Sequence, residues 1–334
     1  MDEHKEFDMI AIGDIVTDAF IRIKQASVYY DSTEHTEKIC LINGGKIPYE
    51  FTKVIRGTGN SANADVAATR LGLHTALVTN LGDDDNGKEI LKALDKDGIN
   101  QKFIRVHPGK ISNFNYVLWF KDERTILIRH EDYDYVLPDI GEPKWIYFSS
   151  VSENSMDYHR AIAEYLHQHP NVKLAFQPGT FQVKLGIEAL KDIYTATEVF
   201  FCNKEEAQRL LKTEETNTAK LAKEMTTHGP KIAVITDGEH GAFMYDGENA
   251  WSLAPFPSTE APYERTGAGD SFASTFTSAL ILGKSHEEAL IWGAANSRNV
   301  IQYVGAQEGL LTRDELEKRI ANKPADYGPQ KVTL

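Results

Sequence analysis

The feature that most constrains the fold is a regular alternation of short apolar runs and helix-compatible segments, which begins near residue 57. The apolar runs have the length of strands that are buried on both faces. Strand–helix repetition of this kind predicts an α/β protein with a mostly parallel sheet between two layers of helices. The expected strands are 7–13, 75–79, 145–149, 172–176, 199–201 and 232–236, followed by a hairpin, 241–245 with 250–253. The expected helices are 59–71, 86–94, 155–167, 183–193, 204–211, 218–227, 270–282, 287–303 and 313–320.

Two segments depart from this alternation and have the pattern of antiparallel strands. Residues 20–56 mix apolar and polar residues around the turn Asn43-Gly44-Gly45, and residues 112–130 alternate in the same way around a turn that starts at Lys121. We therefore expect insertions at about 20–56 and 110–130 to form a small β-sheet. Such a sheet serves as a lid over a site, as a dimerisation surface, or as both. The remainder predicts one domain over residues 1–334.

The composition excludes several classes of function. Lys and Arg number 36 against 49 Asp and Glu, so a net charge of -13 argues against binding to nucleic acid or to an anionic membrane. Cys40 and Cys202 lie far apart and suggest neither a disulfide framework nor a zinc site. The charged start and the absence of a membrane-length apolar run predict a cytoplasmic protein.

The strongest local motif is Glu264-Arg265-Thr266-Gly267-Ala268-Gly269-Asp270, which runs directly into a helical segment. Glycines before a helix let its first N–H groups converge on one point, where the helix dipole also favours an anion. Asp270 in the first turn would stand beside that anion as a base, which is what phosphate transfer to a hydroxyl needs. The alternative is a glycine-rich turn whose aspartate only caps the helix.

Other motifs each allow a functional and a structural interpretation. Asn203 and Glu206 suit water-mediated binding of Mg²⁺, or a helix-capping box. Thr236, Gly238 and Gly241 either border a nucleotide or form a tight turn. Acids at the end of the first strand, Asp14 and Asp18, bind hydroxyl groups or are solvated. Three histidines, 159, 167 and 169, lack metal-site spacing and are expected at the surface.

A rival interpretation comes from Gly57-Thr58-Gly59-Asn-Ser-Ala62, which matches a dinucleotide-binding turn and predicts an NAD-dependent oxidoreductase. The acids at 83–85 follow at about the spacing of a ribose-binding acid. However, this turn follows an insertion-like segment and not a clean first strand. The oxidoreductase would also leave the motif at 264–270 without a role.

Taken in order, these motifs resemble the signatures of the ribokinase-like (PfkB-type) family of carbohydrate and nucleoside kinases. Residues 264–270 are similar to its D-T-x-G-A-G-D signature, and 58–72 to its G-G-N-x-x-N-x-A-x-x-x-A-R-L-G signature. The family's N-x-x-E and T-x-G-x-x-G motifs match 203–206 and 236–241. The resemblance implies a three-layer α/β/α fold with a β lid, and an ATP- and Mg²⁺-dependent kinase for a hydroxyl group of a small sugar or sugar derivative.

The resemblance also implies roles for individual residues. Asp270 would be the catalytic base, and the N–H groups of Gly267, Ala268 and Gly269 would stabilise the transferred phosphoryl group. Hydroxyl groups of the acceptor would be bound by Asp18, Gly59 and Asn63, and Mg²⁺ through water by Glu206 with Asn203. The nucleotide would be bordered by Thr236, Gly238, Gly241, Asn296 and Val300.

The departures from the family pattern concern Thr58, Asp65 and the pair Glu264-Arg265. An Asp at the position of Glu264 helps to form a monovalent-cation site in many relatives, so dependence on K⁺ is left open. The identity of the acceptor is also open: the same fold serves nucleoside kinases, whose lid aromatics stack a base, and an inactive sugar-binding protein is a further alternative. An exposed edge of the lid sheet would suit a homodimer.

Overall fold

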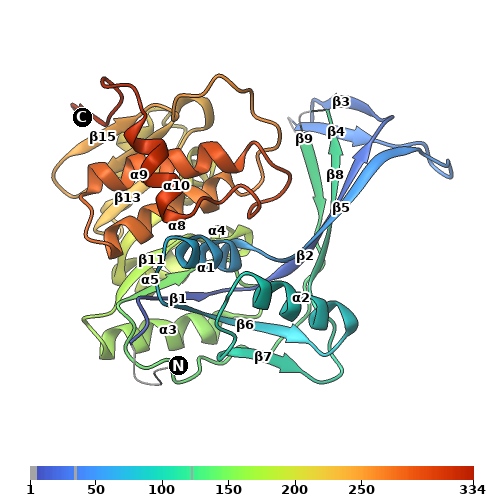
Figure 1. Cartoon of the computed structure of the whole chain (residues 1–334), viewed down its shortest axis with the longest axis horizontal. Coiled ribbons are helices and arrows are strands. Elements are labelled where there is room, and N and C mark those ends of the chain that lie inside the picture. Colours follow the sequence, from blue (N-terminus) through green and yellow to red (C-terminus); the bar gives the residue numbers. More distant parts are fainter. Residues whose placement is uncertain (1–5, 34–35, 122) are drawn as a thin grey trace.

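The computed structural model describes residues 6–33, 36–121 and 123–334. The charged start and residue 122 of the turn expected after Lys121 lie outside these ranges. Two sheets dominate the structure: a ten-stranded sheet inside the main body and a four-stranded sheet that projects from one side (Figure 1). No helix in the described ranges is long and apolar enough to cross a membrane.

The main sheet has the strand order β16-β15-β14-β13-β12-β11-β10-β1-β6-β7. Pairing is parallel from β13 to β7 and antiparallel from β13 to β16. The strands are β1 (Met9–Ile12), β6 (Thr75–Gly82), β7 (Ile104–His107), β10 (Trp145–Phe148), β11 (Lys173–Phe176), β12 (Thr197–Asn203), β13 (Ile232–Thr236), β14 (Ala242–Tyr245), β15 (Ala250–Leu253) and β16 (Gln330–Val332).

Helices cover both faces of this sheet, because its central strands are apolar on both sides. In β1, Met9 and Ala11 belong to one core cluster and Ile10 and Ile12 to the other. The first face is covered by α1 (Asn60–Arg70), α2 (Asp85–Lys96), α8 (Ala268–Ile281), α9 (His286–Val300) and α10 (Arg313–Ala321). The second is covered by α3 (Met156–Gln168), α4 (Thr180–Ala189), α5 (Lys191–Ala196), α6 (Lys204–Leu211) and α7 (Thr218–Thr226). The predicted three-layer α/β/α fold is therefore confirmed.

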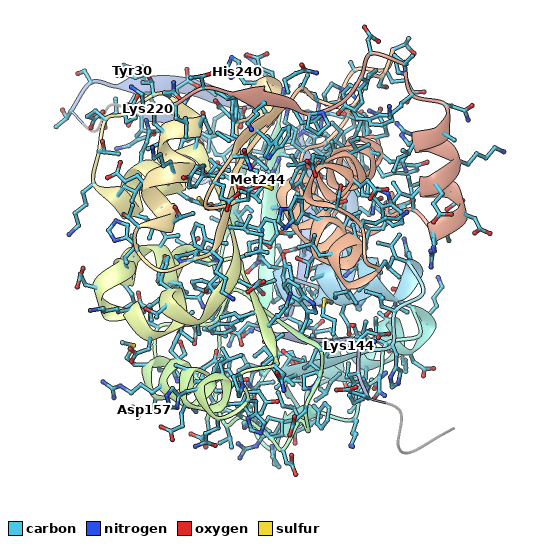
Figure 2. All side chains as sticks on the ribbon, turned by 90° about the vertical axis from the view of Figure 1, so that its left-hand side faces the viewer. Tyr30, Lys144, Asp157, Lys220, His240 and Met244 are labelled. Atoms are coloured by element: carbon cyan, nitrogen blue, oxygen red, sulfur yellow. The ribbon has the colours of Figure 1, made fainter. Side chains whose placement is uncertain are left out.

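The interior of the body is visible in a perpendicular view. Met244 of β14 is fully buried inside the body, whereas Asp157 and Lys220 lie toward its left edge in this view (Figure 2). Tyr30 marks the far end of the projecting sheet region (Figure 2).

The four-stranded sheet, which we call the lid, has the order β5-β2-β8-β9. Its strands are β2 (Val16–Ile23), β5 (Tyr49–Thr58), β8 (Phe114–Phe120) and β9 (Glu123–Leu127), and a two-stranded hairpin, β3 (Ser27–Asp31) and β4 (Thr36–Cys40), extends it. One lid face packs against the body, where Phe20, Val117 and Trp119 meet Val304. Both insertions predicted from sequence form this sheet, although β2 starts at Val16, before the predicted boundary.

Three details differ from the sequence expectation. The edge strands β7 and β16 were not expected, and the predicted helix 183–193 is two helices, α4 and α5. His159 is buried, with 2% of its surface exposed, and its ring bonds to Gln182, so the prediction of a surface position was wrong for this histidine.

Candidate active site

The amino-terminal end of α8 is shaped to receive an anion. Gly267 has a φ of 77°, and a Cβ placed there would lie 2.2 Å from the Cβ of Ala306, so the position accepts only glycine. The N–H of Ala268 bonds to the carbonyl of Arg265 at 3.3 Å, while those of Gly267 and Gly269 have no backbone acceptor within the described ranges. Free N–H groups at the positive end of a helix are a binding site for phosphate.

Asp270 lies in the first turn of α8 and is held from two sides. Asn63 Nδ2 donates to its Oδ2 at 2.8 Å, and Gln177 Nε2 donates to its Oδ1 at 3.0 Å. Burial raises the pKa of Asp270 above the ordinary value for aspartate, while the two amides and the guanidinium of Arg124 act in the opposite direction. Because both amides donate, the carboxylate is bound as the anion, which is the form that accepts a proton.

Each amide is itself oriented by a further residue. Gln307 Nε2 donates to Asn63 Oδ1 at 3.0 Å, and the hydroxyl of Tyr147 donates to Gln177 Oε1. An amide whose oxygen accepts a hydrogen bond has its NH₂ group on the other side, here toward Asp270. The direction of both donors is therefore fixed by the packed interior and not by solvent.

Asp18 lies at the root of the lid, close to Asp270. Its carboxylate accepts from Thr58 Oγ1 at 2.8 Å and from Asn115 Nδ2 at 3.1 Å, and these partners belong to the adjacent strands β5 and β8. Burial raises the pKa of Asp18, and the negative charge of Asp270 contributes to that rise. At Gly59, φ is 108° and a Cβ would lie 2.7 Å from the carbonyl oxygen of Asp14. Asp18 and Asn63, predicted from sequence, thus lie near Asp270, and the predicted Gly59 begins the helix that carries Asn63.

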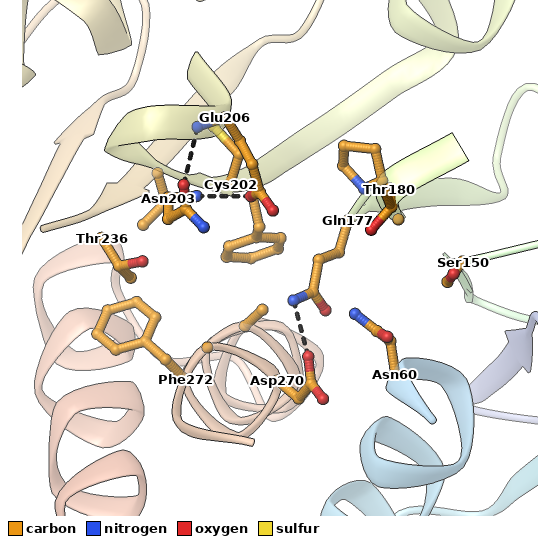
Figure 3. A pocket seen from close by; sticks show the side chains of 16 residues that line it. Asn60, Ser150, Gln177, Thr180, Cys202, Asn203, Glu206, Thr236, Asp270 and Phe272 are labelled. Carbon is orange, nitrogen blue, oxygen red and sulfur yellow. Dashed lines mark hydrogen bonds between the residues drawn. The ribbon is translucent and has the colours of Figure 1, made fainter. Parts of the chain in front are cut away.

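A cavity of about 250 Å³ opens in front of Asp270 (Figure 3). Asn203 and Glu206 form its opposite wall, and the side chain of Gln177 crosses the space between them and Asp270 (Figure 3). Asn203 Oδ1 accepts from the N–H of Glu206 at 2.8 Å, and Glu206 Oε2 accepts from the N–H of Asn203 at 2.9 Å. The pair is therefore the capping box that the sequence allowed, and its side chains also line the cavity.

Glu206 is the carboxylate in this cavity that suits a divalent cation. Burial raises its pKa, with the N–H of Asn203 opposing the shift, and Asp270 adds negative charge nearby. Within the described ranges no cluster of three His, Cys, Asp or Glu side chains would hold a metal ion on its own. One carboxylate that adds to phosphate oxygens and water is the usual environment of Mg²⁺ at a nucleotide, so the residues fit that ion.

A second cavity, of about 480 Å³, adjoins the first through Thr236, Gly269 and Phe272. It is lined by the predicted Gly238 and Gly241, by the apolar segment 253–257, and by Ala294, Ser297, Arg298 and Ile301. A largely apolar pocket that leads to a helix N-terminus suits a nucleotide base followed by its phosphates.

Two residues predicted for this pocket lie elsewhere. Asn296 and Val300 are fully buried. Asn296 donates to Thr275 Oγ1 at 2.8 Å and accepts from the N–H of Leu311 at 2.9 Å, so it ties α9 to α8 and to the loop before α10. The helix was expected correctly, but its opposite face borders the cavity.

The dinucleotide interpretation of 57–62 does not agree with the topology. Gly57 and Thr58 end β5, a lid strand paired antiparallel with β2, and not a strand of the parallel sheet. The turn of a dinucleotide-binding unit joins a parallel strand to its helix. Here the segment instead brings Gly59 and Asn63 to Asp270.

Comparisons with known proteins agree with this architecture. The fold is shared with ribokinase-like structures: a ribokinase from Arabidopsis thaliana, solved with ribose and ATP, superposes with a TM-score of 0.77 at 20% identity and covers 95% of this chain and 99% of its own. A nucleoside kinase from Methanocaldococcus jannaschii gives 0.74 at 18% identity, with coverage of 95% and 99%.

The family follows from the sequence match. Residues 26–313 match the pfkB family of carbohydrate kinases, and the chain belongs to that family. Among its curated relatives, 5-dehydro-2-deoxygluconokinase 1 of Bacillus cereus is 25% identical over an alignment 336 positions long, gaps included, that covers 94% of this chain and 95% of the relative. The protein is thus a carbohydrate kinase by family.

Proposed function

We propose that the protein transfers the γ-phosphoryl group of ATP to a hydroxyl group of a small sugar or sugar derivative, with Asp270 as the base. One observation carries the proposal: the carboxylate of Asp270 is held by Asn63 and Gln177 at the wall of the first cavity, directly after Gly269, which lines both cavities. A hydroxyl bound beside Asp18 and Asn63 and a phosphate bound at the start of α8 would then both touch the same carboxylate.

In the proposed reaction Asp270 accepts the proton of the acceptor hydroxyl as its oxygen bonds to the γ-phosphorus. The bond from that phosphorus to the oxygen bridging the β- and γ-phosphates breaks, and ADP leaves. The N–H groups of Gly267 and Gly269 stabilise the charge on the oxygens being transferred. Phosphoryl transfer needs mainly positioning and charge neutralisation, which fixed backbone donors supply without reorganisation.

Mg²⁺ bound with the nucleotide would supply further positive charge at the phosphates. We assign Glu206 and Asn203 to hold its water ligands, because they line the cavity opposite Asp270. The base of the nucleotide would lie in the second cavity, against Phe256 and the face of α9 that carries Ala294 and Ser297.

The orientation of the lid favours a sugar over a nucleoside as acceptor. Asn115 and Asp18 are paired across β8 and β2 and face the site, so their neighbours Phe114 and Tyr116 face away from it. Tyr116 is 49% exposed on that outer face. Phe114 and Tyr116, two of the lid aromatics that could stack a nucleoside base, are therefore turned away from Asp270.

The test is an ADP-release assay with ATP and Mg²⁺ across neutral sugars, sugar acids, sugar phosphates and nucleosides, run in parallel with Asp270→Asn. We expect saturable turnover with a sugar or sugar derivative, and a loss of at least about a thousandfold in kcat for the variant. Unchanged turnover in Asp270→Asn would refute the mechanism. Turnover with nucleosides alone would replace the substrate class.

We further propose that the lid mediates a homodimer. Large hydrophobic side chains are exposed on its outer face and on the hairpin, among them Val54, Tyr116 and Leu127. An exposed sheet with an apolar face is a surface that a second copy can cover. Analytical ultracentrifugation should give twice the mass of the chain, and Tyr116→Lys should shift the equilibrium to the monomer. A wild-type monomer at micromolar concentration would contradict the proposal.

A further inference from the structure

Glu264 is a buried carboxylate placed immediately before the anion-binding loop. Its side chain is 2% exposed. Oε1 accepts from the N–H of Thr266 at 2.8 Å and from its hydroxyl at 2.6 Å, and Oε2 accepts from the N–H of Gly305 at 3.2 Å. Thr266 precedes Gly267, and Gly305 precedes Ala306, on which Gly267 packs. One carboxylate therefore fixes both sides of the contact that shapes the loop.

The countercharge of this carboxylate comes from the lid. Arg124 of β9 places Nη1 3.1 Å from Glu264 Oε1, and its side chain is 28% exposed. Arg124 pairs with Trp119 across β9 and β8, and the Trp119 ring meets Tyr263 edge to face at 5.5 Å. The lid thus reaches residues 263–264 through a cation and an aromatic ring side by side.

Burying a carboxylate without a countercharge is costly, and removing one partner of a buried pair leaves that cost unrelieved. The guanidinium of Arg124 supplies the countercharge to the buried carboxylate of Glu264. The influence of Arg124 extends further, because its charge also acts to lower the pKa of Asp270. The position of the lid and the shape of the anion-binding loop are therefore coupled through the Arg124–Glu264 ion pair and the Trp119–Tyr263 ring contact beside it.

We infer that Arg124 is a positioning residue for phosphoryl transfer: from the lid, its guanidinium holds Glu264, which in turn holds Thr266 and Gly305 and so the donors at the start of α8. The inference rests on the proposed function. At the position where many relatives bind a monovalent cation, the guanidinium of Arg124 supplies the positive charge next to Glu264.

A bound monovalent cation does not fit beside Glu264. Oε1 already receives two hydrogen bonds from Thr266 and the guanidinium of Arg124, and Oε2 receives the N–H of Gly305. A second cation at this place would be repelled by Arg124 and would find few oxygen lone pairs. We therefore expect the wild-type enzyme to work at the same rate in potassium and in tetramethylammonium buffers.

The experiment compares Arg124→Gln and Arg124→Lys with Lys110→Gln. Lys110 is a matched control, because its Nζ pairs with Glu131 Oε1 at 3.1 Å at the base of the β8–β9 hairpin, and this ion pair involves none of residues 263–269 or 304–306. For Arg124→Gln we expect kcat to fall by about tenfold to a hundredfold, the size of a lost charged hydrogen bond, with the KM for the sugar nearly unchanged. Arg124→Lys should recover part of that loss, and Lys110→Gln should keep the wild-type kcat.

A second measurement does not depend on turnover. Binding of a non-hydrolysable ATP analogue with Mg²⁺, followed by calorimetry, should weaken about tenfold in Arg124→Gln and stay unchanged in Lys110→Gln. If no acceptor is turned over, the proposed function fails, and this binding comparison still decides the role of Arg124. Equal nucleotide affinity in wild type and Arg124→Gln, an equal loss in Lys110→Gln, or a wild-type rate that requires potassium would each overturn the inference.

Discussion

Asp65 offers the most direct measurement of what burial costs in this chain. It lies in α1, two residues after Asn63, and is fully buried. Neither carboxylate oxygen of Asp65 has a hydrogen-bond partner of good geometry. The nearby hydroxyl of Thr75 acts to lower the pKa of Asp65, against the larger rise that burial causes. Burial raises the pKa of Asp65 from 3.8 to about 7. Between pH 3.8 and about 7 the folded protein therefore holds a proton on Asp65 that the unfolded chain has already lost.

This pKa shift fixes the sign and the size of the contribution that Asp65 makes to the free energy of unfolding. The proton on Asp65 contributes stability that is fully present below pH 3.8 and is lost as the pH rises through about 7. A difference of about 3 pKa units corresponds to about 4 kcal/mol between the two limits. Asp65→Asn removes the ionisation and keeps the shape. At pH 8 we expect the variant to be more stable than wild type by up to about 4 kcal/mol, or about 6 °C in Tm for a chain of this length.

The assay is thermal or urea denaturation of both proteins between pH 4 and pH 8. We expect the stability difference to be near zero at pH 4 and to grow steadily with pH. The control is Asp95→Asn, at an exposed position of α2, for which the difference should stay flat. A difference between Asp65→Asn and wild type that does not change with pH would refute the reasoning.

Three further predictions concern the site. Burial raises the pKa of Asp270, so log kcat/KM should fall toward acid pH with an inflection above pH 3.8. Gln177→Glu adds a carboxylate beside Asp270 and should move that inflection to higher pH. An inflection at the same pH in the variant would contradict the contact between Gln177 and Asp270. Gly267→Ala should lower kcat by about a hundredfold because the new Cβ would overlap Ala306. The control is Gly283→Ala, at a similar φ of 79° in open space, which should leave kcat unchanged. Equal losses of kcat in the two variants would indicate backbone strain and not the contact with Ala306. Arg265 lines the second cavity, which we propose to hold the nucleotide. Arg265→Gln should therefore raise the KM for ATP about tenfold with little change in the KM for the sugar; a raised KM for the sugar alone would contradict this placement.

The layered fold could be predicted because its signal is local. Strand β13 matches the predicted range, Ile232–Thr236, and helix α6 matches Lys204–Leu211, since each has an apolar pattern with clear ends. Strands β7 and β16 carried no such signal: they are short edge strands with exposed residues, and only pairing with a neighbour makes them strands. In α9 small residues such as Ala294 and Ala295 lie on both faces of the helix, so the sequence did not indicate which face lines the second cavity.

The site could be predicted where its residues are contiguous in sequence. Gly267 to Asp270 form one motif whose geometry depends on neighbouring backbone, and the expected loop is present. Gln177, Gln307 and Arg124 were missed, because each is a single polar residue outside any motif. Their roles arise only from tertiary contact, and no periodicity or spacing marks them.

The hydrogen bonds of Asp270 have a consequence for how the chain becomes active. Asn63 is 207 residues away from Asp270 along the chain, and Gln177 is 93 residues away. Contacts between such distant segments form late, because the entropy of closing long loops must be overcome first. A refolding chain should therefore regain far-UV ellipticity before it regains catalysis. Enzyme activity in this protein therefore requires that the distant segments around Asp270 have come together. Fragments that form only local helices and strands will be inactive.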